Sequence, residues 1–424
     1  MFVIEAAIAK AAEGIGIPAE QIQLLNLLQT GNQFPFGQIA KSEAVNVWQK
    51  ATQLYDKDDM LSQIAVFNAN NKLFKKGYSF MPVCFGISFT KTFMNQARAL
   101  VHVFTDGSVN LSTGAVEMGQ GVNTKMLQVA ALTLSIDPAK IKVNTTSTFR
   151  IANTSPSAAS ATADLNGKAV SMACTTIMNR LKKVASDALN TDISLVEFSN
   201  EHIWLNGQQT DITWEKLVMM AYVQRVSLSE HAHYSTPGIH FDHSKEKGHP
   251  FAYHVYGTAI TTVTLDCLRG IYEVDAVKIV HDIGSGLSPV IDRGQVEGGL
   301  VQGIGWMTME ELIYDDAGRL RSNSLSTYKV PDIYSAPKEI SIHFMESGDD
   351  NLGLMRSKAV GEPPLMYGIG TFFALRHAIK AFNPGSACSF SAPMTPEKAL
   401  LSLYSSPIVT PALKRENSNA HDIV

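Results

Sequence analysis

Apolar residues recur with helical spacing through the first part of the chain. Residues 2–13 are mostly helix formers, and Pro18 follows a glycine-containing break at a position suited to begin a second helix. Ser42 and Asp59 are residue types that cap helix N-termini, so we expect further helices to follow them. The pattern therefore predicts a helical lead-in over residues 1–78.

The pattern becomes strand-like near residue 79. Residues 83–89 and 100–105 are rich in side chains that favour strands, and residues 109–113 follow Asp106-Gly107, a strong hairpin turn. Two helices are expected after this hairpin. The first covers residues 124–134, behind the glycine-rich loop GAVEMGQG, and the second covers residues 161–189.

A second strand-rich stretch begins near residue 251. Strands are expected over residues 257–265 and 271–283, and Pro289 is expected to open a helix that runs to Leu312. The sequence thus predicts an α+β fold of two stacked blocks, each with a hairpin, a glycine-containing loop and a helix. The expected division is a helical lead-in at 1–78, a first block at 79–250, a second block at 251–398 and a polar tail at 399–424.

The composition limits the class of protein. Apolar residues make up 45% and charged residues 17%, which excludes disorder of the whole chain. A formal net charge of -4 disfavours a nucleic-acid partner. The four cysteines form no CxxC pair, no uncharged apolar run approaches the ~20 residues of a membrane span, and the N-terminus lacks a leader pattern. We therefore expect a cytoplasmic protein with no membrane partner and no zinc or iron–sulfur ligands of its own.

Two segments suggest a site with chemistry. In GAVEMGQG, Gln120 lies between two glycines, where its amide can donate to and accept from a heterocycle edge; the alternative is a tight strand-to-helix turn. Glu362 lies between Gly361 and Pro363-Pro364 in an expected rigid, non-helical loop. Burial among apolar neighbours would raise the pKa of Glu362 and suit it to proton transfer; the alternative is a surface turn with a solvated carboxylate.

A third segment is the pair His281-Asp282 at an expected strand end. Such a pair can be catalytic, but the aspartate of such a pair more often caps or braces a turn. No serine nucleophile elbow and no GK[ST] loop occurs in the sequence, so hydrolase and nucleoside-triphosphate functions have no support. A nucleotide-binding module without redox chemistry would rest on the glycine-rich loop alone.

Taken together and in order, these segments resemble one family, the molybdenum-binding domain of xanthine dehydrogenase and xanthine oxidase. The resemblance runs from near residue 1 to about Lys398. The matching motifs are Phe85-Gly-Ile-Ser-Phe89-Thr90, Asp106-Gly107 through Gly119-Gln120-Gly121, Asn153 to Ser160, Asp164 to Gly167, Ile291 to Gly298, Thr327 to Pro331 and Ser357 to Leu365.

The resemblance implies a role for each matching residue. Glu362 would be the general base of a hydroxylation. Phe89 would pack its ring against a flat purine, and Thr90 would hydrogen-bond the heterocycle. The implied cofactor-binding residues are Met118, Gly119, Gln120, Ala159, Ser160, Thr162 and Gln295, with the backbone of Ala159 next to the molybdenum of a molybdopterin cofactor.

The resemblance also implies a substrate class and missing parts. Both purine-type motifs, FGISFT and GEPPL, are intact, so the conversion of hypoxanthine to xanthine and urate is favoured over aldehyde oxidation. The family's molybdenum domain is far longer than this chain, and part of its substrate site precedes the segment matched by Met1. FAD and 2Fe-2S clusters would lie on absent domains or on a partner chain.

Two hypotheses of different classes follow. In the first, the chain is the C-terminal molybdopterin-binding part of a working purine hydroxylase that another polypeptide completes. In the second, it is a truncated, folded remnant without cofactor or catalysis, which would expose apolar surface and self-associate.

Overall fold

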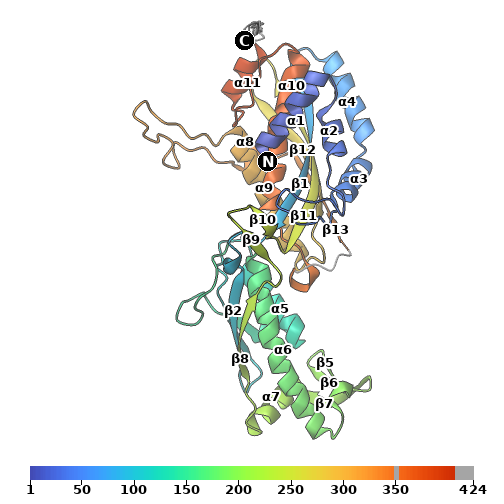
Figure 1. Cartoon of the computed structure of the whole chain (residues 1–424), viewed down its shortest axis with the longest axis vertical. Coiled ribbons are helices and arrows are strands. Elements are labelled where there is room, and N and C mark those ends of the chain that lie inside the picture. Colours follow the sequence, from blue (N-terminus) through green and yellow to red (C-terminus); the bar gives the residue numbers. More distant parts are fainter. Residues whose placement is uncertain (348–352, 406–424) are drawn as a thin grey trace, which may run out of the picture.

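The computed structural model describes residues 1–347 and 353–405 and has two lobes stacked along its long axis (Figure 1). Each lobe packs helices against its own sheet, so the α+β fold expected from the sequence is confirmed. We name the lobes after one element of each: the β1 lobe holds both ends of the described chain, and the α6 lobe is inserted between strands β1 and β11.

The β1 lobe is built on a four-stranded sheet in the order β1-β11-β12-β13. Its first two pairings are antiparallel and its last is parallel. The strands are β1 (Phe74–Ile87), β11 (Tyr253–Asp266), β12 (Tyr272–Asp282) and β13 (Glu339–Met345).

Strand β1 corrects two expectations from the sequence. It begins nine residues before the predicted strand, at Phe74, because Gly77 and Pro82 resemble breaks yet pair with β11 along the whole strand. The predicted division at residue 79 falls inside this strand. The strand pairing therefore separates the chain near Ile87 instead.

Both faces of this sheet are buried, so neighbouring strand residues pack on opposite sides. Met81 and Ala259 face the cluster formed with α8 (Pro289–Thr308) and α10 (Ile369–Phe382). Phe80 and Ile260 face Trp48 and its neighbours on α3 (Ala44–Leu54). Helix α8 ends at Thr308, four residues before the predicted Leu312.

The expected N-terminal helices are present. They are α1 (Phe2–Ile15), α2 (Ala19–Leu25), α3 and α4 (Lys57–Asn70). Phe2 lies edge-on to Phe372 of α10, with ring centroids 4.9 Å apart, so α1 is packed on the β1 lobe. The cap of α4 is Asp56 rather than the predicted Asp59, because the Asp56 carboxylate accepts from the Asp59 backbone N–H.

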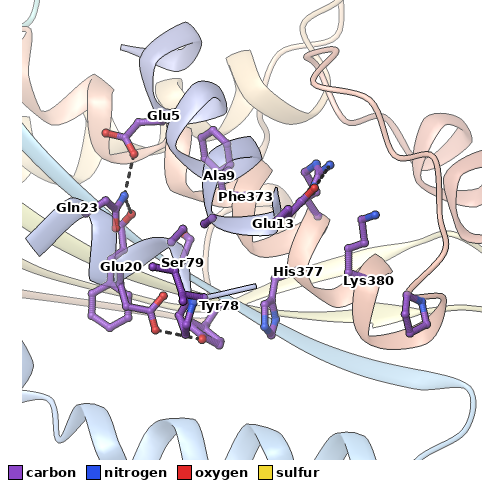
Figure 2. Close-up of a pocket in the computed structure, with 17 residues that line it drawn as sticks. Glu5, Ala9, Glu13, Glu20, Gln23, Tyr78, Ser79, Phe373, His377 and Lys380 are labelled. Carbon is purple, nitrogen blue, oxygen red and sulfur yellow. Dashed lines mark hydrogen bonds and ion pairs between the residues drawn. The ribbon is translucent and has the colours of Figure 1, made fainter. Parts of the chain in front are cut away.

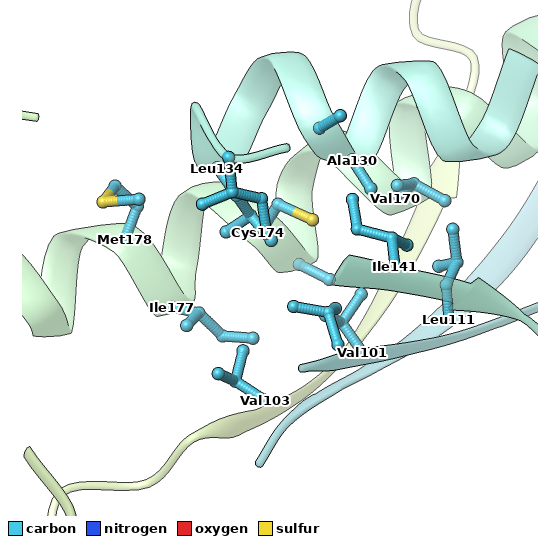
Figure 3. Close-up of a cluster of buried hydrophobic side chains, with 14 of the residues drawn as sticks. Val101, Val103, Leu111, Ala130, Leu134, Ile141, Val170, Cys174, Ile177 and Met178 are labelled. Carbon is cyan, nitrogen blue, oxygen red and sulfur yellow. The ribbon is translucent and has the colours of Figure 1, made fainter. Parts of the chain in front are cut away.

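The α6 lobe has a four-stranded sheet in the order β4-β3-β2-β8, covered by the long helix α6 (Figure 3). Strand β2 alternates strictly between buried and half-buried residues, since only one face of this sheet meets the helices. The elements are β2 (Gln96–Val103), β3 (Val109–Thr113), α5 (Val122–Leu134), β4 (Ile141–Val143), α6 (Thr162–Ala188), β5 (Val196–Ser199), β6 (His202–Leu205), β7 (Gln208–Thr213), α7 (Trp214–Val223) and β8 (Ser229–Ser235).

The remaining elements are β9 (His240–Asp242), β10 (Lys247–His249), α9 (Pro363–Tyr367) and α11 (Pro396–Leu403). Helix α11 corrects the start of the predicted tail, because Ala399 and Leu403 are buried in the β1 lobe. The rest of the predicted tail, from residue 406, lies outside the described residues. Among the described residues, no helix is both long and apolar enough to cross a membrane.

Candidate functional site

Loops from both lobes surround one cavity of about 370 Å³. The α6 lobe contributes residues around 118–125 and 157–164, and the β1 lobe contributes residues 357–362 and part of α8. The predicted site residues that line this cavity are Met118, Gln120, Ala159, Ser160, Thr162, Gln295 and Glu362. The fold therefore gathers residues that are far apart in the sequence.

Ser160 and Glu362 are in direct contact. The Ser160 hydroxyl donates to Oε2 of Glu362 over 2.9 Å and accepts from the Glu362 backbone N–H over 2.7 Å. Two groups of Glu362 are thus fixed by one side chain, which orients the carboxylate at the cavity wall.

The surroundings of Glu362 differ from those expected. The residue is exposed, because its apolar neighbours Pro363 and Pro364 turn inward and begin helix α9. The predicted burial and the predicted non-helical loop are therefore wrong. Glu362 also lines a second cavity, of about 450 Å³, with Phe85, Ala159 and Phe251 among its walls.

The backbone of the opposite loop is strained. Ala159 and Ser160 have φ angles of 56° and 51°, in the left-handed region that non-glycine residues seldom adopt. Consecutive residues in this region cluster at functional sites, where the surrounding structure holds them. Gly361 is equally constrained, since a Cβ there would lie 2.9 Å from the Ser160 hydroxyl.

The loop GAVEMGQG is organised by Glu117, a residue that the sequence pattern did not single out. Its carboxylate accepts from the backbone N–H groups of Gly119, Gly121 and Asn123 at 2.9–3.0 Å. Slight burial alone would raise the pKa of Glu117, but these backbone hydrogen bonds together lower it. An acidic residue just before an expected helix N-terminus was the available signal.

Gln120 bonds to its own loop. Its amide oxygen accepts from Met118 N–H at 2.6 Å, and its amide nitrogen donates to the Val116 carbonyl at 2.8 Å. Gly119 does not line the cavity, and with a φ of 100° it serves the turn. These contacts fit the turn interpretation, and a cofactor would have to share or replace them.

Two buried ion pairs brace the cavity, and sequence reasoning missed the residues of one and the lysine of the other. Lys125 of α5 meets Asp292 of α8 at 2.7 Å, which ties the two lobes together. Lys358 meets Asp282 at 2.5 Å, with side chains 2% and 0% exposed. This second pair fixes the 357–362 loop to the end of β12. No local sequence pattern announces such pairs, because their members are distant in the chain.

The pair His281-Asp282 is structural. His281 is fully buried and its Nδ1 lies 2.6 Å from the Tyr367 hydroxyl. Burial lowers the pKa of His281 to about 4, so the ring is neutral. Asp282 pairs with Lys358 and also accepts from the Gly284 N–H. The bracing interpretation fits these contacts.

The predicted substrate residues lie apart from the other site residues. Neither Phe89 nor Thr90 is among the residues that line the two cavities. Phe89 is half-buried, with its backbone N–H and carbonyl held by the Asn95 side chain at 2.8 Å, and Thr90 is exposed. Their roles remain a prediction from the sequence.

The cavity suits a cofactor of the pterin type. Its volume falls within the usual range of small-molecule sites, roughly 300–1,000 Å³. The Ser160 hydroxyl and the Gln295 and Gln120 amides offer donors and acceptors, as the polar edge of a pterin requires. Within residues 1–347 and 353–405, the Gln295 amide makes no hydrogen bond, so it is available to a ligand.

Comparisons with known proteins agree with this geometry. Quinoline 2-oxidoreductase from Pseudomonas putida 86 superimposes with a TM-score of 0.83 at 20% identity, covering 96% of this chain and 52% of that one. Aldehyde oxidoreductase from Desulfovibrio desulfuricans does so with a TM-score of 0.76 at 21% identity, covering 95% and 40%. At these identities the likeness shows the fold, which is that of the large domain of molybdenum hydroxylases.

The sequence comparisons identify the family. A family model described as the molybdopterin cofactor-binding domain matches residues 50–337. The chain belongs to this family. It is 39% identical over 406 residues to xanthine dehydrogenase/oxidase from Mus musculus, which covers 94% of this chain. The chain spans 29% of the length of that relative.

Proposed function

We propose that this chain is the molybdopterin-binding part of a purine hydroxylase of the xanthine dehydrogenase type. The observation that carries the proposal is the contact of Ser160 with both the carboxylate and the backbone of Glu362 beside the 370 Å³ cavity. The 39% identity to the mouse xanthine dehydrogenase/oxidase supports the choice of substrate class.

Several residues would hold the cofactor. Gln295 would bond it with its free amide, and Gln120 and Ser160 would contribute an amide and a hydroxyl. The left-handed backbone at Ala159 would bring main-chain atoms close to the metal. When bound, molybdopterin supplies the centre that accepts electrons from the substrate.

Glu362 would act as the general base. Hydroxylation exchanges a ring C–H for a C–O bond to an oxygen from water, and it releases two protons and two electrons. An exposed carboxylate at the cavity wall, held by Ser160, is placed to take up one of these protons. The electrons would pass to FAD and 2Fe-2S groups, which we place on a further polypeptide together with the remaining substrate-binding residues.

Turnover of the molybdenum-loaded protein tests this proposal. Xanthine, hypoxanthine and benzaldehyde would be offered to the chain purified with whatever polypeptides accompany it. Purine oxidation that Glu362→Gln abolishes without loss of molybdenum is the expected result. Preferential oxidation of benzaldehyde would favour the aldehyde-oxidising alternative, and absence of bound molybdenum would favour the non-catalytic remnant.

A further inference from the structure

A cavity of about 640 Å³ lies between the α1–α2 hairpin, strand β1 and helix α10 (Figure 2). No role in the proposed hydroxylation involves it. Its walls are partly apolar, with Ala12, Ile17, Phe80 and Phe373 among them. Its polar groups are more informative, because several of them lack the partners that buried polar groups normally have.

Two carboxylates of this cavity are buried without a cation. Glu5 and Glu20 are 9% and 7% exposed, and neither belongs to an ion pair within residues 1–347 and 353–405. Glu5 accepts only from the Gln23 amide, at 2.7 Å, and Glu20 from the Tyr78 hydroxyl, at 3.2 Å. Burying a carboxylate without a positive partner costs free energy, which a cation in the cavity would offset.

Burial also affects how Glu5 titrates. It raises the pKa of Glu5, against the opposing effects of the Gln23 hydrogen bond and the N-terminal ammonium group. Glu13 differs from these two residues, because it forms an ion pair with Arg376 at the cavity wall. The excess of negative charge therefore belongs to Glu5 and Glu20.

Other unpartnered atoms of the cavity are mainly acceptors. The Oε1 atom of Gln23, a residue only 6% exposed, has no hydrogen-bond partner. The Nδ1 atom of His377 also has none, and burial lowers the pKa of this ring to about 4, so it is neutral. The His377 ring lies against Tyr78, with centroids 4.4 Å apart.

The cations at the wall are already engaged. Arg376 binds Glu13 and the Cys388 carbonyl, which leaves only its Nε without a partner. Lys380 donates to the Ser386 carbonyl at 2.7 Å. In the described residues, no group of three or more His, Cys, Asp or Glu side chains is arranged to hold a metal ion. The missing partner is therefore a donor of organic type.

We propose that this cavity binds a small organic cation, an ammonium or amidinium group on an apolar body. The cationic N–H groups donate to Glu5, Glu20 and the Gln23 carbonyl oxygen, and the apolar body packs on the walls around Phe80 and Phe373. Tyr78 presents a further aromatic ring to the charge. The available volume accommodates a ligand of one or two rings.

Titration calorimetry with benzamidine tests this proposal on the full chain. Benzyl alcohol and benzoate serve as neutral and anionic probes of similar size. We expect benzamidine to bind with one-to-one stoichiometry and at least about tenfold more tightly than either, since a charge-assisted hydrogen bond contributes roughly 1.5–3 kcal/mol. Equal affinity for the three probes, or no heat with benzamidine at millimolar concentration, would overturn the proposal.

Variants locate the site. Glu5→Gln and Glu20→Gln each remove one charge while keeping the side-chain size, so each should weaken benzamidine binding about tenfold. Both variants should fold, because each loses an unpaired buried charge, and circular dichroism checks this. Glu197→Gln, an exposed carboxylate of the α6 lobe, is the matched control and should leave binding unchanged. Binding that survives in both cavity variants would place the cation elsewhere and overturn the assignment.

Discussion

The hydroxyl of Ser160 both donates to the carboxylate of Glu362 and accepts from its backbone N–H, although the residues are 202 positions apart. Because each residue belongs to a different lobe, the relative position of the lobes sets where the carboxylate lies. The candidate site is thus a product of the interface between lobes, and changes at this interface should affect activity before they affect the fold.

Removing the Ser160 hydroxyl tests its positioning role. In the molybdenum-loaded enzyme, Ser160→Ala should lower kcat for xanthine about tenfold to a hundredfold with little change in KM, because the base loses its orientation while substrate binding remains. Steady-state kinetics and molybdenum content measured together check this. A parallel loss of molybdenum would instead assign the hydroxyl to holding the cofactor.

The buried pair Lys358–Asp282 should contribute strongly to stability. Lys358→Met leaves a fully buried aspartate without its cation, which costs about 3–5 kcal/mol of unfolding free energy. The double variant Lys358→Met/Asp282→Asn should recover much of that loss, because the residual charge is removed. Urea denaturation measures both, with Lys183→Met at an exposed ion pair as a control that should change stability by less than about 1 kcal/mol. A single variant as stable as the parent would argue against this role.

Close packing of helix α8 on α9 depends on Gly303. A Cβ at this position would lie 2.1 Å from the Leu365 carbonyl oxygen, so Gly303→Ala should destabilise the fold by about 1–3 kcal/mol. A Cβ added at Gly298, in the same helix, would meet no atom within 4 Å, and Gly298→Ala should stabilise by about 0.5–1 kcal/mol. Thermal melts of the two variants that shift in the same direction would contradict this account.

Stability should fall as the pH drops below 6.5. Burial lowers the pKa values of His254, His281 and His377 from 6.5 to about 4, so the unfolded chain binds more protons than the folded chain between these values. One fully buried ring such as His281 should cost about 1 kcal/mol at pH 5.5. Urea midpoints between pH 7 and 5 measure the combined slope.

A variant separates this effect from general acid sensitivity. His254 stacks on Phe34, with centroids 4.5 Å apart, so His254→Phe keeps the ring contact while removing one titrating group. The slope should decrease in this variant and stay the same in His231→Phe, where the ring is exposed. An unchanged slope in His254→Phe would mean that other groups govern the acid response.

Local sequence signals located many elements well. The Asp106-Gly107 turn lies between β2 and β3 as predicted, with Gly107 at a φ of 84° and the Asp106 carboxylate accepting from the Ser108 N–H. Helix α6 covers Thr162–Ala188, within one residue of the prediction at each end. Both features depend on contacts a few residues apart, which is why the sequence predicts them.

Features that depend on distant contacts were missed. The start of β1 at Phe74 is defined by its pairing with Asp266 and not by its own residues, which include two lysines and a glycine. The exposure of Glu362 follows from which side of α9 meets the core, and the GEPPL motif alone does not specify it. Lys358 gave no signal because its partner lies 76 residues away.

The most direct test of the central claim is molybdenum and pterin analysis of the protein purified from its native host without a tag on any partner. The account expects close to one molybdenum and one pterin for each chain, a co-purifying second polypeptide, and a Glu362→Gln variant that keeps the metal while losing xanthine turnover. A folded protein that carries neither molybdenum nor pterin would contradict the proposal that the 370 Å³ cavity holds the cofactor.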